Sequence, residues 1–95
     1  MSGKIQGQVV AISDNGDAVT DISIDQLKDA PVDESVSIRC EGHVTACIFP
    51  VDHDQPSMTF LAKQGSSGCL ELSLVGDSVQ AFLGIQPGSK VTVAW

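Results

Sequence analysis

Apolar and polar residues alternate along most of this chain, and a period of two is typical of half-buried β-strands. The clearest case is residues 69–74, CLELSL, whose three leucines would face the core. Turn signals separate the alternating runs, and the strongest is the dipeptide Asn15-Gly16, which is typical of a tight hairpin. The pattern predicts seven strands, over residues 4–12, 18–24, 35–40, 43–49, 58–63, 69–74 and 89–95.

Three of these strands carry more detailed expectations. Residues 43–49, HVTACIF, are apolar on both faces, so we expect a strand that is central in the sheet or covered on both sides. Gly7 predicts a bulge or bend in the first strand, because glycine in a strand interior often marks such a site. In the second strand we expect Val19 to face the core, with Ile22 and Ile24 as further candidates.

Two short stretches break the alternation and predict helical turns. Residues 25–30 would start at Asp25 as N-cap and stop before a proline. Residues 76–83 place Phe82 on an apolar helical face with two other apolar residues, and Gly84 would end that helix.

Many short strands separated by regular turns are typical of closed β-structures. We therefore predict an all-β fold, a small antiparallel seven-stranded β-barrel with one or two short helices; a small β-sandwich is the alternative. A chain of 95 residues without repeats or linkers predicts a single domain over residues 1–95. Tyr is absent and aromatic residues are few, so the core must consist mostly of Val, Ile, Leu and Ala.

The net charge of −7 comes from 12 acidic residues against five basic ones. Nucleic acids and anionic membranes are bound through clustered Lys and Arg, so this balance argues against both kinds of partner. Acidity also keeps a protein soluble, and it suits a cationic ligand.

The three cysteines, Cys40, Cys47 and Cys69, form an odd count without a C-x-x-C pair, so we expect buried free thiols and no disulfide framework. We find no leader-like N-terminal segment and no apolar run long enough to span a bilayer, and we expect a cytoplasmic protein.

A metal site is one candidate for chemistry. Cys40 and His43 have a tolerable spacing for ligands, and Asp52, His53 and Asp54 would add further donors. However, Cys40 shares the alternation of the core-facing residues before it. We therefore expect a core thiol and a solvated acidic loop, with no metal and no cofactor.

The turn in residues 64–72, QGSSGCLEL, is a second candidate. Ser66, Ser67 and Cys69 have no base beside them in the sequence, and the turn has neither the Lys of a P-loop nor a directly following helix. Nothing in this stretch therefore predicts catalysis or phosphate binding.

Two longer stretches resemble a known family. Residues 10–24, VAISDNGDAVTDISI, resemble the segment "hydrophobic-D-x-F-G-N-hydrophobic-x-T-N-I" that opens the C-terminal domain of the S-adenosylmethionine (SAM) hydroxide adenosyltransferases, relatives of the fluorinases and chlorinases. Residues 65–93 resemble that domain's ending, "N-S-x-G-Y-L-E-I-A … A-x-x-L-G-x-x-x-G-D-x-V". The spacing between the two stretches also fits.

The resemblance implies a small antiparallel barrel that, in the full-length enzymes, packs against a larger N-terminal α/β domain. The adenosyl ligand lies between the two domains, and the N-terminal domain activates water or halide. By resemblance, this chain would not catalyse the reaction alone.

The family's ligand-binding positions transfer only in part to the first stretch. The family's Phe and Asn of F-G-N fall on Asn15 and Asp17, while Gly16 and Thr20 are kept. The family's second Asn becomes Asp21. The aromatic residue that would stack on adenine is therefore lost.

In the later turn, the family's Asn falls on Gly65, Ser66 and Gly68 match, and the following Tyr becomes Cys69. The family's aromatic-bearing loop falls near Asp52 and His53. The resemblance thus implies four ligand-binding residues, Asn15, Asp17, Ser66 and Ser67.

The family residues that this chain keeps are those that a barrel needs. The family residues that it lacks are those that an adenine site needs. An aromatic–base stack contributes roughly 1–3 kcal/mol in nucleic-acid binding, so its loss weakens nucleoside affinity. We expect a non-catalytic stand-alone barrel that self-associates or docks on a partner protein. The alternatives are a weak SAM- or adenosine-binding module and the C-terminal subunit of a split SAM hydroxide adenosyltransferase.

Overall fold

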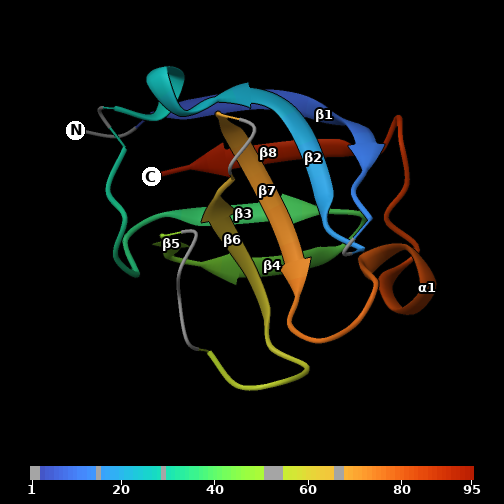
Figure 1. Ribbon diagram of the computed structural model, residues 1–95. Helices are drawn as coiled ribbons and strands as arrows, with labels where there is room; N and C mark the ends of the chain where they lie inside the picture. The colour runs from blue at the N-terminus through green and yellow to red at the C-terminus, as the bar shows by residue number, and fades with distance from the viewer. Residues whose placement is uncertain (1–2, 15, 29, 51–54, 66–67) are drawn as a thin grey trace.

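The computed structural model describes residues 3–14, 16–28, 30–50, 55–65 and 68–95 (Figure 1). The described elements, in chain order, are β1 (Lys4–Ile12), β2 (Ala18–Ser23), the 3-10 helix η1 (Ile24–Leu27), β3 (Ser37–Cys40), β4 (His43–Ala46), β5 (Ile48–Phe49), β6 (Phe60–Gln64), β7 (Cys69–Leu74), α1 (Val79–Leu83) and β8 (Lys90–Ala94).

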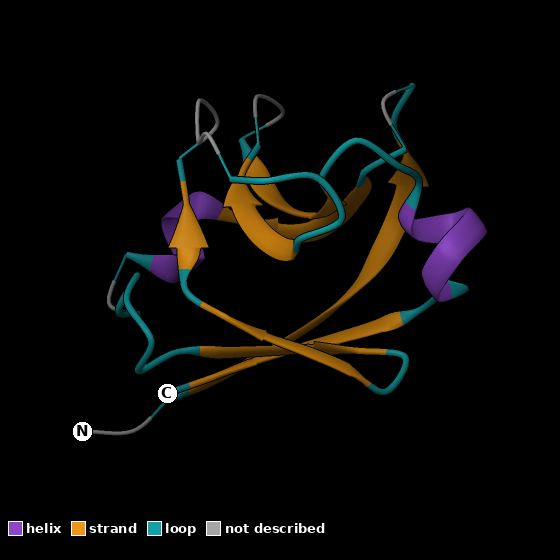
Figure 2. Cartoon of the chain, turned by 90° about the horizontal axis from the view of Figure 1, so that it is seen from below, coloured by secondary structure: helices purple, strands orange, loops and turns teal. Residues whose placement is uncertain are grey.

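The strands form one sheet in the order β4-β3-β8-β1-β2-β7-β6-β5. The sheet curves into a nearly closed, barrel-like wall, with α1 at one side (Figure 2). The hydroxyl of Thr45 in the edge strand β4 donates a hydrogen bond to the carbonyl oxygen of Phe60 in β6 (3.1 Å), which is the strand next to the opposite edge. The predicted mostly β, barrel-like fold is therefore confirmed.

The strand count and the pairing differ from the prediction. The described chain has eight strands rather than seven, and β5 runs parallel to β6 while the other described pairs are antiparallel. The cause is Cys47, which has a φ of 73°. This left-handed conformation lies outside the β region, so the predicted strand over 43–49 breaks into β4 and β5.

β1 belongs to two ladders at once. Its first half pairs with β8, and its second half pairs with β2. The register shifts between Val9 and Ala11, so the bulge lies there and not at Gly7 as predicted. Gly7 has another role, because an added Cβ would lie 2.6 Å from the Cγ1 atom of Ile22. The glycine lets β2 cross close over β1.

The core is aliphatic, as expected from the composition. The predicted inward sets are buried: Val36, Ile38 and Cys40 on β3 and its approach, and Leu70, Leu72 and Leu74 on β7. Two expected inward side chains are not buried. Val19 is only half-buried because Ala18, Thr20 and Ile22 face inward instead, and Phe82 on α1 is 57% exposed.

Side-chain caps begin both helices. The hydroxyl oxygen of Ser23 accepts from the Gln26 N–H (3.3 Å), and the Gln26 side chain accepts from the Ser23 N–H (2.8 Å). This capping box replaces the expected cap at Asp25. The helix α1 is capped by Ser78 and starts later than the predicted residue 76, but it ends as predicted, at Gly84 in a left-handed conformation. Among the described residues, no helix is long and apolar enough to cross a membrane.

The positive φ of Cys47 generates a test of the strand break. A non-glycine residue in the left-handed region costs about 1–2 kcal/mol relative to glycine. We expect Cys47→Gly to be about 1 kcal/mol more stable than Cys47→Ala, because both remove the thiol but only glycine removes the strain. Urea unfolding of the two variants measures the difference. A more stable alanine variant would contradict this account of β5.

Candidate functional site

Three turns carry the residues that the resemblance implies. Asn15, Ser66, Ser67, Asp52 and His53 lie outside the described residues. Asp17 is described, and so are the residues that flank the other positions. The site is therefore built here from Asp17 and its neighbours on the outer face of the sheet.

Asp17 ends the turn between β1 and β2. The Ser13 N–H donates to the Asp17 carbonyl oxygen (2.8 Å), and the Asp17 N–H donates to the Ser13 hydroxyl oxygen (3.2 Å). Gly16 packs against the start of α1, where an added Cβ would lie 2.8 Å from the Ser78 Cα atom. Its φ of 85° and this close approach together explain why glycine occupies the position.

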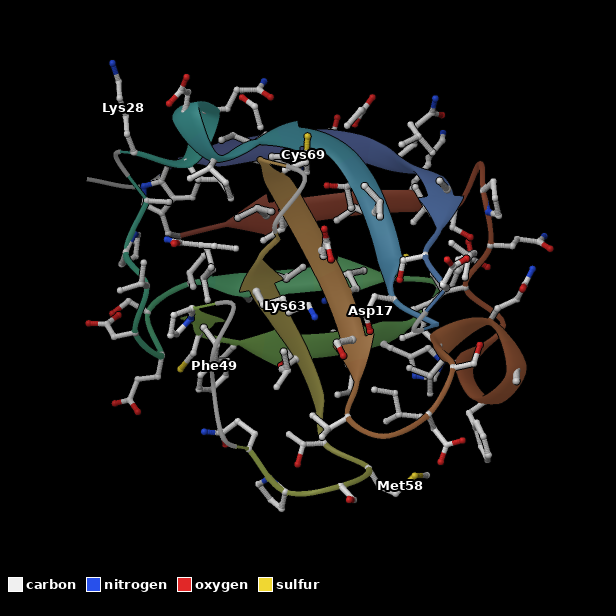
Figure 3. The ribbon with its side chains drawn as sticks, viewed as in Figure 1. Asp17, Lys28, Phe49, Met58, Lys63 and Cys69 are labelled. Carbon is white, nitrogen blue, oxygen red and sulfur yellow. The ribbon has the colours of Figure 1, made fainter. Side chains whose placement is uncertain are left out.

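The carboxylate of Asp17 is paired within the chain. The Lys63 Nζ atom on β6 lies 2.7 Å from the Asp17 Oδ2 atom. The side chains are 13% and 7% exposed, respectively, so most of the pair is removed from water. β7 lies between β2 and β6 in the sheet, and the two side chains point toward one another across its outer face (Figure 3). The charge of Asp17 is thus neutralised by the protein itself.

Sequence reasoning missed the rest of this outer polar layer. Glu71 and Ser73 alternate with the core leucines of β7, yet they are only 6% and 5% exposed. Glu71 is the direct register partner of Lys63, and its side chain lies against Gly65 at the end of β6. Strand alternation correctly predicts that these residues face away from the core. It carries no signal that the second face is also buried.

At two further positions that the resemblance singles out, the side chains form hydrogen bonds with the backbone of the barrel. Thr20 is fully buried, donates to the Leu70 carbonyl oxygen (2.6 Å) and accepts from the Ile22 N–H (3.2 Å). It thereby connects β2 to β7 where their register is irregular. The Asp21 Oδ1 atom accepts from the Gln8 N–H (2.9 Å) beside the β1 bulge. Both side chains satisfy backbone groups that regular pairing would otherwise satisfy.

Of the metal candidates, Asp52, His53 and Asp54 lie outside the described residues, which leaves Cys40 and His43. Cys40 and His43 are register partners in the β3–β4 hairpin, but Cys40 is 1% exposed within the core. Burial raises the pKa of the Cys40 thiol to about 11, and the charge of Glu41 acts in the same direction. The His43 Nε2 atom lies 3.2 Å from the Leu83 carbonyl oxygen. Within the described ranges, no three His, Cys, Asp or Glu side chains gather as metal ligands.

No family model matches the sequence, and no curated protein matches it. A solved structure of an uncharacterised conserved protein from Thermotoga maritima is 20% identical, with a TM-score of 0.76 over 95% of this chain and 35% of that one. A conserved hypothetical protein from Thermus thermophilus is 24% identical, with a TM-score of 0.66 over 93% and 34%. The fold is shared with larger proteins. This chain spans about a third of the length of each, and at these identities the likeness establishes the fold alone.

The ion pair allows a direct test. Lys63→Met would leave a buried Asp17 carboxylate without its cation, and breaking a buried pair on one side costs about 3–5 kcal/mol. We expect Asp17→Asn/Lys63→Met to cost clearly less than the sum of the single changes, because it leaves no unpaired charge. Urea unfolding of the four proteins measures the coupling. Lys28→Met removes an exposed lysine as the control, and a loss no larger for Lys63→Met would refute the assignment.

Cys40 gives a pH-dependent prediction. Its folded-state pKa of about 11 lies above the ordinary value of 9.0, so the folded protein holds the thiol proton more tightly than the unfolded chain. The stability from this group is complete below pH 9 and is lost as the pH rises toward 11. We expect Cys40→Ala to lose less unfolding free energy than the wild type over this range. Parallel pH profiles in urea unfolding would contradict the burial of the thiol.

Proposed function

We propose that this chain is a non-catalytic β-barrel module that acts by contact with another protein chain, either a second copy or a separate partner. The observation that carries the proposal is the ion pair between Asp17 and Lys63. The resemblance would place Asp17 beside an adenosyl ligand, but here its charge is paired with Lys63 across the outer face of β7. Thr20 and Asp21 likewise bond to the barrel backbone.

The comparisons support a module that contacts a further protein domain or chain. In both larger proteins, the part similar to this chain makes up about a third of the whole. In each of these proteins the barrel occurs together with further chain, so a contact between a barrel of this fold and another domain is compatible with the comparisons. If the family resemblance holds, that further domain is the catalytic one, and this barrel has no activity by itself.

Two other roles belong to the same proposal as alternatives. One is the C-terminal subunit of a split SAM hydroxide adenosyltransferase, whose partner would then be the catalytic chain; this role rests on the resemblance, and the coverage of about a third is compatible with it. Weak SAM or adenosine binding through the turns around Gly16 and Gly68 is the other. For location we propose the cytoplasm, because all three cysteines are free thiols.

A titration followed by NMR separates contact from ligand binding. We expect adenosine and SAM, added to millimolar excess, to leave the amide signals of Gly16, Asp17 and Gly68 unshifted, because Lys63 already neutralises Asp17. S-adenosylhomocysteine, which lacks the sulfonium charge, is the matched control ligand. Sedimentation equilibrium of the same sample reports self-association.

Saturable shifts at these three amides would overturn the proposal in favour of a nucleoside-binding module. Stronger shifts with SAM than with S-adenosylhomocysteine would further mean that an acidic side chain attracts the sulfonium. The proposed contact function would be refuted if the protein is strictly monomeric and also fails to bind a purified N-terminal catalytic domain of the resembled family.

A further inference from the structure

The outer face of β1, β8, β3 and β4 is a continuous, exposed part of the sheet. Cross-strand register places its residues in rows, because directly paired residues of antiparallel strands lie on the same face. One row runs from Lys4 to Ser37, and the next runs from Gln6 to Arg39. We call this the cationic face; its members are Lys4, Gln6, Gln8, Lys90, Thr92, Ala94, Ser37, Arg39, Val44 and Ala46.

The charge of this face is opposite to that of the chain. Lys4, Arg39 and Lys90 are three of the five basic residues of a protein with a net charge of −7. None of the ten positions is Asp or Glu, although twelve such residues occur in the chain. Asp21 and Glu41 lie only at its borders, next to the β1 bulge and in the β3–β4 turn.

The shape of the face suits acidic side chains. A hollow of about 320 Å³ lies between Lys4 and Arg39, and its floor consists of the small residues Ser37, Thr92 and Ala94. Lys4 and Arg39 lie two strands apart and in adjacent rows, so with strands about 4.8 Å apart and about 3.4 Å per residue their Cα atoms are roughly 12 Å apart. The guanidinium of an arginine binds a carboxylate in a two-pronged geometry, whereas a lysine acts as a point charge.

The same chain supplies a complementary surface. Asp33 and Glu34 are consecutive, exposed residues in the loop between η1 and β3. The Asp33 Oδ1 atom accepts from the Ser35 N–H (2.9 Å), and this hydrogen bond lowers the pKa of Asp33. Asp33 therefore keeps its negative charge at neutral pH.

We propose that the cationic face receives the acidic loop of a second copy of this chain, with Asp33 and Glu34 of one copy against Lys4 and Arg39 of the other. This inference rests on the proposed contact function and names its partner and its surface. Two cationic faces repel one another, so each contact joins a face to a loop. Every copy carries both halves of this contact.

Charge reversal tests the pairing. One variant reverses the face, Lys4→Glu/Arg39→Glu, and the other reverses the loop, Asp33→Lys/Glu34→Lys. Sedimentation equilibrium is run at about 0.1 M salt, where the Debye length is about 10 Å and distant charges are screened. We expect the wild type to self-associate, each variant alone to bind itself about tenfold more weakly or worse, and their equimolar mixture to regain association.

Arg39→Glu and Lys28→Glu form a matched control pair, because they change the net charge equally and only Arg39 lies on the face. We expect Lys28→Glu to associate as the wild type does. Dispersed NMR spectra of all variants confirm that they are folded, so lost association reports the contact and not unfolding.

The other outcomes separate the proposed surface, its proposed occupant and the proposed function. Equal behaviour of Arg39→Glu and Lys28→Glu in an associating protein would refute this surface and leave the proposed function standing. A wild type that stays monomeric would refute the second copy as occupant, while binding to a purified partner chain would still satisfy the proposed function. Shifts of the Lys4 and Arg39 amides with inorganic phosphate in a monomeric protein would instead assign the face to small anions.

Discussion

The ion pair between Lys63 and Asp17 connects the parts of this barrel that are far apart in sequence. It spans the outer face of β7 and so ties β6 to the start of β2. A pair with so little exposure is stable only when both partners are present, because either charge alone would be costly to bury. Glu71 and Ser73 lie on the same buried outer side of β7, so polar side chains are buried there, opposite the aliphatic core.

This arrangement also divides the basic residues into two uses. Lys63 forms an ion pair with Asp17 of the same chain. Three of the remaining four basic residues lie on the cationic face of β1, β8, β3 and β4. On the outer face of β2, β7 and β6 the charges are therefore paired within the chain, whereas on the outer face of β1, β8, β3 and β4 they are exposed to solvent. Contact between chains, rather than ligand capture at the turns, is the function that this division favours.

Local irregularities close the barrel. The bulge between Val9 and Ala11 lets β1 serve two ladders, and Gly7 lets β2 approach it closely. The turn of the chain at Cys47 then carries β5 alongside β6. Periodicity predicted the strands around these points well but placed the bulge at the wrong residue and missed the break, since a single residue's φ leaves no periodic signal.

The sequence by itself determined most of the strands, most of their inward faces, the C-terminal end of α1 and the barrel class. These features follow from short-range physics: alternation places side chains on one face, and serine and glycine cap a helix. Only the tertiary structure decided that Lys63 meets Asp17, 46 positions away in sequence, and that Lys4 and Arg39 share a face. Such neighbours depend on strand order and register, which the sheet fixes through long-range pairing and which no local pattern encodes.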